Sequence, residues 1–309
     1  MRDVFIKALE EIATEDDRLM LIAGDLGYGV FDEFRRMHPF NFLNAGVSEQ
    51  NMTSIATGMS LEGHIVYTYS IGNFSTFRCL EQIRNDACYH DANVKIVSVG
   101  GGFSYGPLGI SHHATEDLAV MRSIPNLTVI SPCGLWEAYN ATKAIHNCEG
   151  TCYLRLDKSF GNDEPIDSRE EYKVGRARVI RKGSDISLFV TGGILEEVDN
   201  VAKILELKGI SVQIISIHTL KPIDEKAIID SAIKTALVAT IEEHTIHGGL
   251  GSAISEVIMD NGLQIQGFVR IGLEAGFSSI VGSQKYLRKR YNLSSEIIAN
   301  KLISFIDKN

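Results

Sequence analysis

Long apolar runs and clusters of basic residues are both missing from this 309-residue sequence. No run approaches the roughly 20 apolar residues that a membrane helix needs, and residues 1–5 lack the basic and then apolar layout of a signal peptide. Acidic residues outnumber basic ones by 39 to 30, which gives a formal net charge of −9. Because phosphate binding needs clustered Lys and Arg, we expect neither a nucleic-acid nor a membrane partner. The one basic run, at 285–290, is interpreted as a solvated helix face.

Cysteine is also scarce, with five residues, which is an odd number and includes no CxxC pair. The spacing of these residues offers no tetrahedral set of thiol ligands, so no metal ligand is predicted in this chain. A sequence without a framework of paired cysteines fits a reducing compartment, and we expect a cytoplasmic protein.

The sequence does contain a regular alternation of short apolar runs and amphipathic stretches. Glycine is frequent, with 28 residues against 6 prolines, as tight turns between strands and helices require. The alternation predicts an α/β fold of two three-layer α/β/α domains with mostly parallel sheets. The first domain is predicted at 1–160, a polar linker at 161–183 and a second domain at 184–309.

The apolar periodicity also predicts individual elements. Strands are expected at 19–23, 65–69, 94–99, 127–131, 152–156, 186–191, 212–217, 237–241 and 265–271. Helices are expected at 50–61, 77–89, 135–146, 194–205, 224–234, 250–260 and 294–306. A short hairpin is expected at 174–180.

Four segments between strands and helices could carry chemistry, and the first is 44–51. Glu49 stands where a strand ends and a helix begins, and Ser48 is expected to cap that helix. Ligands of open α/β sheets gather at the carboxyl ends of strands, which favours a functional role for Glu49. The residues alone leave open the alternative that this carboxylate only stabilises the helix start.

The second segment, 72–78, holds Phe74 and Phe77 three residues apart, so both rings can face one side of an opening helix. They either pack in the core or form the apolar wall of a pocket for a flat heterocycle.

The fourth segment, 242–251, places a glycine turn before a helix. Its backbone amides could bind an anion, or the glycines serve the turn alone.

The third segment, 100–113, is too rich in glycine for regular structure. Long loops inside compact domains are usually functional. His112 and His113 lack a third ligand at the spacing of a zinc site, so a metal is not expected. A loop histidine in a cleft is instead suited to shuttle a proton or to donate to an oxyanion.

In this order, the segments resemble the C-terminal half of transketolase, which is a pyrimidine-binding domain followed by the transketolase C-terminal domain. The resemblance covers nearly the whole chain. It is carried by GVSEQN at 46–51, NFSTF at 73–77, SHHATEDLAVMRSIPNLTVISP at 111–132, HTLKPID at 218–224 and EEHTIHGGLG at 242–251. Similar motifs occur in deoxyxylulose-phosphate synthase and in β subunits of 2-oxo acid dehydrogenases.

The resemblance implies thiamine diphosphate as the cofactor and assigns roles to individual residues. Glu49 matches the glutamate that activates the cofactor's pyrimidine ring, and His112 matches a histidine that faces the substrate carbonyl. The cofactor-binding positions are matched by Glu49, Gly46, Phe74 and Phe77. The substrate-binding positions are matched, more loosely, by His113, Arg2, Arg155 and Lys158.

The family's diphosphate and Mg²⁺ site, a GDG sequence with a downstream Asn, has no match here, and 24–26 is the nearest approach. The resemblance therefore implies a partner chain that carries the N-terminal half with the diphosphate and Mg²⁺, in an α2β2 assembly. The implied reaction transfers a two-carbon ketol unit from a ketose-type donor to an aldose-type acceptor, both small sugars. The alternatives are a 2-oxo acid dehydrogenase β subunit, a deoxyxylulose-phosphate synthase-like enzyme and a non-catalytic assembly subunit.

Two departures from the family pattern concern the donor substrate. Leu108 stands where sugar-phosphate transketolases have an acidic residue, and Gly100 stands where a histidine is common. A site without the carboxylate that binds a sugar hydroxyl loses much of its specificity for that sugar. We therefore expect a donor other than the usual pentose phosphates.

Overall fold

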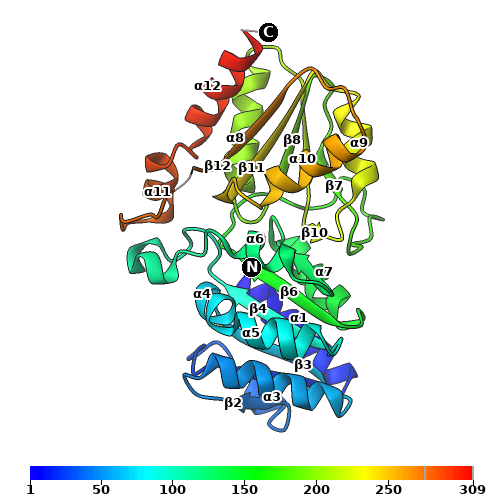
Figure 1. The fold of residues 1–309 in the computed structure, drawn as a ribbon, viewed down its shortest axis with the longest axis vertical. Coiled ribbons are helices and arrows are strands. Elements are labelled where there is room, and N and C mark those ends of the chain that lie inside the picture. Colours follow the sequence, from blue (N-terminus) through cyan, green and yellow to red (C-terminus); the bar gives the residue numbers. More distant parts are fainter. Residues whose placement is uncertain (275, 308–309) are drawn as a thin grey trace.

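The chain folds around two separate sheets, each covered by helices on both faces (Figure 1). The structure is a computed structural model, and it describes residues 1–274 and 276–307. The predicted α/β class with two mostly parallel sheets is confirmed. The predicted domain limits remain a prediction, and their last residues, 308–309, lie outside the described part of the chain. No helix in that part is long and apolar enough to cross a membrane.

The first sheet has seven strands in the order β10-β5-β6-β4-β3-β1-β2. All neighbouring pairs are parallel except β10 with β5. The strands are β1 (Leu19–Ala23), β2 (Phe42–Asn44), β3 (Ile65–Ile71), β4 (Val94–Val99), β5 (Leu127–Ile130), β6 (Thr151–Leu156) and β10 (Thr219–Lys221). The sequence placed the residues of β10 with the second domain, but they complete the edge of the first sheet.

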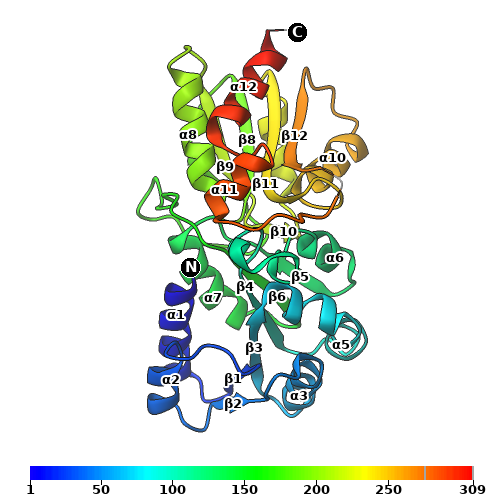
Figure 2. The ribbon, with the colours of Figure 1, turned by 90° about the vertical axis from the view of Figure 1, so that its left-hand side faces the viewer.

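Two apolar cores lie on opposite faces of this sheet, as the three-layer prediction requires. Figure 2 shows α1 (Arg2–Glu15), α2 (Asp32–Met37) and α7 (Leu135–His146) on one face. The other face is covered by α3 (Glu49–Leu61), α5 (Leu80–Gln82) and α6 (Asp117–Ser123). The strands are therefore buried on both sides, which explains their nearly continuous apolar runs.

The second sheet has five strands in the order β12-β11-β8-β9-β7. They are β7 (Arg178–Arg181), β8 (Ile186–Thr191), β9 (Val212–Ser216), β11 (Leu237–Thr245) and β12 (Phe268–Leu273). One core contains α8 (Leu195–Glu206), α11 (Gln284–Arg290) and α12 (Ser295–Ile306). The other contains α9 (Glu225–Ala232) and α10 (Leu250–Asp260).

Two element predictions were wrong. The expected hairpin at 174–180 is a single edge strand, β7, that pairs antiparallel with β9. The expected helix at 77–89 is broken into a 3₁₀ turn at Phe77–Cys79, one turn of α-helix and a π-helix at Ile83–Cys88. The break begins at Thr76, whose φ of −115° and ψ of −84° lie outside the helical region. This irregular backbone directly follows β3 and the short α4 (Gly72–Ser75) and leads into the candidate site.

Candidate active site

Glu49 is a buried carboxylate at the first residue of α3, close to the carboxyl ends of β1 and β3. Its side chain is 2% exposed, and its Oε1 accepts a hydrogen bond of 3.3 Å from Ser70 Oγ on β3. Gly24, just after β1, approaches so closely that a Cβ there would lie 3.3 Å from Glu49 Cγ. Ser48 does not cap the helix as expected, because its hydroxyl donates to Ala45 O at 2.7 Å.

Arg78 is the partner of Glu49 that the sequence did not reveal. Its Nη1 donates to Glu49 Oε2 at 2.7 Å, and its guanidinium carbon lies 4.4 Å from the centre of the Phe74 ring. The Arg78 side chain is 44% exposed, in contrast to the buried carboxylate that it neutralises. Its place immediately after the paired phenylalanines was the only signal available in the sequence.

Phe74 and His112 lie together on one side of this ion pair. Their ring centroids are 5.2 Å apart in an edge-to-face arrangement, and Tyr105 packs against His112 at 6.4 Å. His112 Nδ1 lies 2.9 Å from Ser111 Oγ. Partial burial, and then the neighbouring His113, lowers the pKa of the His112 imidazole, which is therefore neutral at pH 7.

Two predicted residues, Glu49 and Phe74, thus meet at the guanidinium of Arg78, and the third, His112, is joined to them through the Phe74 ring. Phe77 stands outside this chain of contacts and is 38% exposed. Gly46 lies in the turn before α3 with φ of +76°, a conformation that favours glycine. The glycine of this motif therefore has a clear backbone reason, which is to turn the chain from β2 into the helix that carries Glu49.

His113, which is predicted to bind substrate, is buried inside the loop that carries it, and its role toward a substrate stays a prediction. It is 1% exposed, its Nε2 lies 3.0 Å from Gly106 O, and its ring packs edge-on against Phe103. We call residues 100–114 the histidine loop. His113 holds this loop together from within, while the ring of His112, one residue earlier, packs against Phe74 and Tyr105.

Arg155, the second of these residues, is also buried, and its role toward a substrate likewise stays a prediction. It is 1% exposed and lies next to the carboxyl end of the buried strand β6. Its Nε lies 3.4 Å from Asp117 Oδ2 and 3.2 Å from Asp157 Oδ1. Burial lowers the pKa of Arg155, but the carboxylates of Asp117 and Asp157 outweigh burial and raise it. A charge buried in this way has to be paired inside the protein, and these two carboxylates provide that pairing.

Arg2 and Lys158 share a cavity of about 220 Å³ at the carboxyl ends of β4 and β6. The Lys158 Nζ lies 5.7 Å from the centre of the Tyr105 ring, and Tyr105 also contacts His112. The cavity therefore adjoins the site through one aromatic ring. Arg2 is partly neutralised by Asp3 at 2.9 Å.

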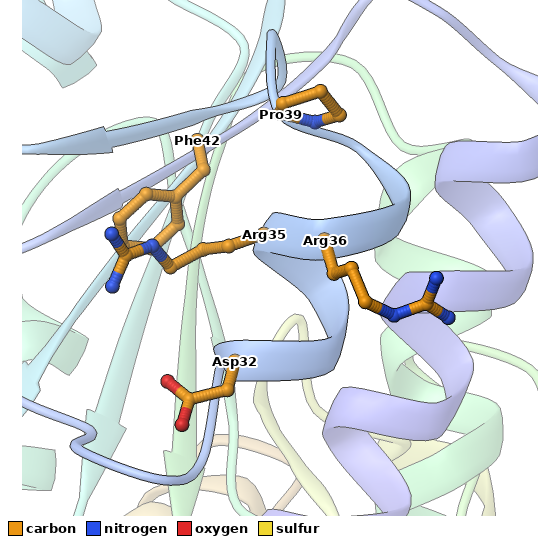
Figure 3. A pocket seen from close by; sticks show the side chains of 5 residues that line it. All are labelled: Asp32, Arg35, Arg36, Pro39 and Phe42. Atoms are coloured by element: carbon orange, nitrogen blue, oxygen red, sulfur yellow. The ribbon is translucent and has the colours of Figure 1, made fainter.

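A larger surface hollow of about 470 Å³ lies elsewhere, at α2 and the β2 edge of the sheet (Figure 3). Arg35 lies over the Phe42 ring at 5.2 Å, while Arg36 is directed away from it toward Glu33. None of the residues predicted for the site lines this hollow.

The glycine turn at 242–251 proves to serve the fold. The amides of Leu250 and Gly251, at the start of α10, donate to the two oxygens of Glu242 at 2.7 and 2.8 Å. Glu242 is fully buried. The amides that an anion would need are therefore already occupied by a carboxylate of the same chain.

Comparison with known proteins identifies the family of this chain. Residues 1–162 match the family model of the transketolase pyrimidine binding domain, and 175–293 match that of the transketolase C-terminal domain. A putative transketolase C-terminal section from Methanocaldococcus jannaschii is 36% identical over 100% of this chain and 96% of its own length. The 6-deoxy-6-sulfo-D-fructose transketolase subunit SqwH of a Clostridium species is 32% identical over 96% of this chain and 92% of its length.

Solved structures agree with this assignment. A split gene transketolase, solved as an inactive β4 tetramer, superposes with a TM-score of 0.87 and is 32% identical, covering 97% of this chain and 95% of its own. The transketolase of Campylobacter jejuni shares the fold, with a TM-score of 0.78 and 17% identity; 98% of this chain covers 46% of that one. The chain therefore belongs to the transketolase family, in which it corresponds to the C-terminal half that other members carry within a longer chain.

Proposed function

We propose that this chain is the pyrimidine-binding half of a two-chain, thiamine diphosphate-dependent transketolase. The enzyme transfers a two-carbon ketol unit from a ketose-type donor to an aldose-type acceptor. The observation that carries the proposal is the buried carboxylate of Glu49 beside Phe74 and His112. The similarity to one subunit of the apulose-4-phosphate transketolase from Actinobacillus succinogenes, 30% identical over 93% of this chain, supports the reaction class.

The residues around Glu49 fit an aminopyrimidine ring. A carboxylate that is 2% exposed forms strong hydrogen bonds, because no water competes for it. Glu49 would hold a proton against the ring nitrogen, while Phe74 and Phe77 would provide apolar contact to the ring faces. Thiamine diphosphate supplies, when bound, the carbanion chemistry that breaks and forms the carbon–carbon bonds.

The Arg78 side chain has to move away from Glu49 before an aminopyrimidine ring can bind there. Its Nη1 occupies Oε2 of Glu49, the oxygen that a ring nitrogen would otherwise reach. Guanidinium is planar, donates hydrogen bonds and stacks on an aromatic face, so it resembles a protonated aminopyrimidine in shape and chemistry. Because Arg78 is 44% exposed, it can turn into solvent without passing through the core.

His112 would act on the substrate side. Its imidazole is neutral at pH 7, because partial burial and His113 lower its pKa. A neutral imidazole can accept a proton from a substrate hydroxyl or donate its N–H to a carbonyl oxygen. The adjoining cavity with Arg2 and Lys158 would take an anionic end of the substrate.

The donor would differ from the usual pentose phosphates. Gly100 has φ of +89°, and a Cβ there would lie 2.2 Å from the Tyr105 ring, so the histidine common at this position would fit only if Tyr105 moved. Leu108 is 56% exposed and presents methyl groups where an acidic residue would bind a sugar hydroxyl. Both features reduce the number of polar groups available to a polyhydroxylated donor.

The diphosphate and Mg²⁺ would be held by a partner chain that carries the GDG motif absent from this sequence. We propose an α2β2 assembly in the cytoplasm. The solved relative that consists of β chains alone is an inactive tetramer, which agrees with a requirement for the other half.

The test is reconstitution with a partner chain that carries GDG and a downstream Asn. We expect the pair, but neither chain alone, to bind thiamine diphosphate and to transfer a ketol unit to an aldose. Glu49→Gln should lower kcat by about 100-fold or more, the range expected for loss of a proton-transferring group. Glu62→Gln, an exposed glutamate at the other end of α3, is the matched control. Full turnover in Glu49→Gln, or turnover only with pyruvate or a lipoyl acceptor, would contradict the proposal.

A further inference from the structure

The histidine loop is a closed ring of backbone that carries His112 near one of its ends. The ends are joined by a bridge in which Gly102 N donates to Ala114 O at 2.7 Å and Ala114 N donates to Gly102 O at 3.1 Å. Two short 3₁₀ turns, Gly106–Leu108 and Ile110–His112, fill the ring. Because its ends are joined, the orientation of His112 depends on what holds the base of the ring.

Glu243, in β11 of the C-terminal domain, reaches that base. Its Oε1 accepts a hydrogen bond of 2.6 Å from Phe103 N. Gly102 approaches so closely that a Cβ there would lie 2.4 Å from the same oxygen. A second link joins the same two regions, because Gly282 N donates to Gly106 O at 3.3 Å. The loop that carries His112 therefore rests on the C-terminal domain.

Glu243 is itself held by two side chains of α11. Arg288 Nε on α11 donates to its Oε2, and Gln284 Nε2 donates to its Oε1 at 3.0 Å. Arg288 Nη2 also donates to Gly193 O at 2.9 Å, which ties α11 to the turn before α8. Glu243 is 3% exposed, so water does not compete for these bonds. The carboxylate thus couples the position of α11 to the position of Phe103.

We infer that Glu243 is a positioning residue for His112: through Phe103 N it sets where the histidine loop stands relative to Glu49 and Phe74. The C-terminal domain thereby contributes to the reaction without touching substrate or cofactor. The kinetic part of this inference rests on the proposed function, while the structural part concerns this chain alone. Small displacements of a catalytic group are enough to lower a rate strongly.

The test compares two adjacent, buried glutamates. Glu243→Gln keeps the shape of the side chain, but its amide cannot accept from both Phe103 N and Arg288 Nε. Glu242→Gln is the matched control, because its carboxylate accepts from Leu250 and Gly251 in α10 and not from the loop. Gln284→Ala is a milder variant that removes one donor to Glu243 and leaves the charges in place.

In the reconstituted pair, we expect Glu243→Gln to lower kcat by about tenfold or more, with the KM for the donor and the affinity for thiamine diphosphate changed by less than about threefold. Glu242→Gln should keep kcat within about twofold. In the full-length isolated chain, the Cε1–H NMR signal of His112, assigned with His112→Asn, should move in Glu243→Gln and stay in place in Glu242→Gln.

Equal losses of kcat in both variants, or an unmoved His112 signal in Glu243→Gln, would show that Glu243 only joins the domains. If Glu243→Gln does not fold, Gln284→Ala decides the question, since an unmoved His112 signal there overturns the inference in the same way. A wild-type pair without ketol transfer would contradict the proposed function, and the NMR comparison would still decide the positioning role.

Discussion

Glu49 and Glu243 are both buried glutamates paired with an arginine, yet their surroundings differ in one decisive respect. Glu49 and Glu243 are 2% and 3% exposed, but their partners Arg78 and Arg288 are 44% and 6% exposed. Glu243 is surrounded by donors from both domains, whereas Glu49 has one exposed guanidinium and one serine hydroxyl. A carboxylate enclosed by its own protein is structural, while one whose main partner can leave is open to a ligand.

The largest difference in stability is expected between the two variants that each remove one of these arginines. Arg288→Ala leaves Glu243 buried without its cation, which we expect to lower the free energy of unfolding by about 3–5 kcal/mol. Arg78→Ala should lower it by about 1 kcal/mol or less, because the pair is partly exposed. Denaturant titration of both variants measures the difference. Equal losses would mean that the Glu49 pair is as structural as the Glu243 pair.

We also expect the residues between the two sheets to make the stability of the protein depend on acid pH. His218 is fully buried there, stacked on Tyr172 at 4.2 Å, and burial, followed by Arg178, lowers its pKa to about 3. Between the ordinary value of 6.5 and about 3, the unfolded chain binds a proton that the folded chain does not. The stability that neutral His218 contributes is therefore present above pH 6.5 and is lost as the pH falls through this window.

We expect His218→Asn to flatten the decrease in unfolding free energy between pH 6.5 and about 3. His90→Asn, at an exposed histidine, is the control and should keep the wild-type slope. The measurement is denaturant unfolding at a series of pH values. An unchanged slope in His218→Asn would place the acid-sensitive group elsewhere.

The histidine loop bonds to Glu243 through Phe103 N and contacts Phe74 beside Glu49 through His112. A substitution at Gly100 tests how tightly this loop is packed. Gly100→Ala adds a methyl group 2.2 Å from the Tyr105 ring at φ of +89°, so we expect a loss of about 1–3 kcal/mol in unfolding free energy. Gly63→Ala has a similar φ of +96° but open space around it, and it isolates the backbone strain. If the two variants lose the same stability, Tyr105 yields freely and a histidine could be accommodated at position 100.

The smallest expected effect concerns Arg78 and the cofactor. Because Arg78 competes for Glu49 Oε2, Arg78→Ala should tighten binding of thiamine diphosphate to the reconstituted pair by up to roughly fivefold, the equivalent of about 1 kcal/mol. Fluorescence titration measures the change, with Arg84→Ala, an exposed arginine on the following π-helix, as the control. Weaker binding in Arg78→Ala would mean that the guanidinium holds the cofactor instead of competing with it.

Most strands and helices were predictable because their signals are local. The apolar runs at 19–23, 94–99 and 186–191 coincide with β1, β4 and β8, and the amphipathic stretch at 135–146 coincides with α7. The burial of individual polar residues was less predictable. Arg155 was matched to a phosphate ligand although its strand is buried on both faces, a pattern that requires an internal partner for any charge.

The basic run at 285–290 was interpreted as a solvated helix face, and for Arg288 this was wrong. Its partner, Glu243, lies on another element, and no local pattern could indicate that the two meet. Arg78 was missed for the same reason, because an arginine that directly follows two phenylalanines has no spacing that indicates its partner. Its ion pair is with Glu49, which lies on a different helix.

The sequence by itself determined the two-sheet α/β fold, the membership in the transketolase family and the position of Glu49 at the end of a strand. These depend on periodicity, glycine turns and short motifs, all of which are properties of neighbouring residues. The tertiary structure alone decided which buried charged side chains have buried partners and which have a partner exposed to solvent. That decision depends on the distance and exposure of partners far apart in the chain, and burial makes an unpaired charge too costly to remain.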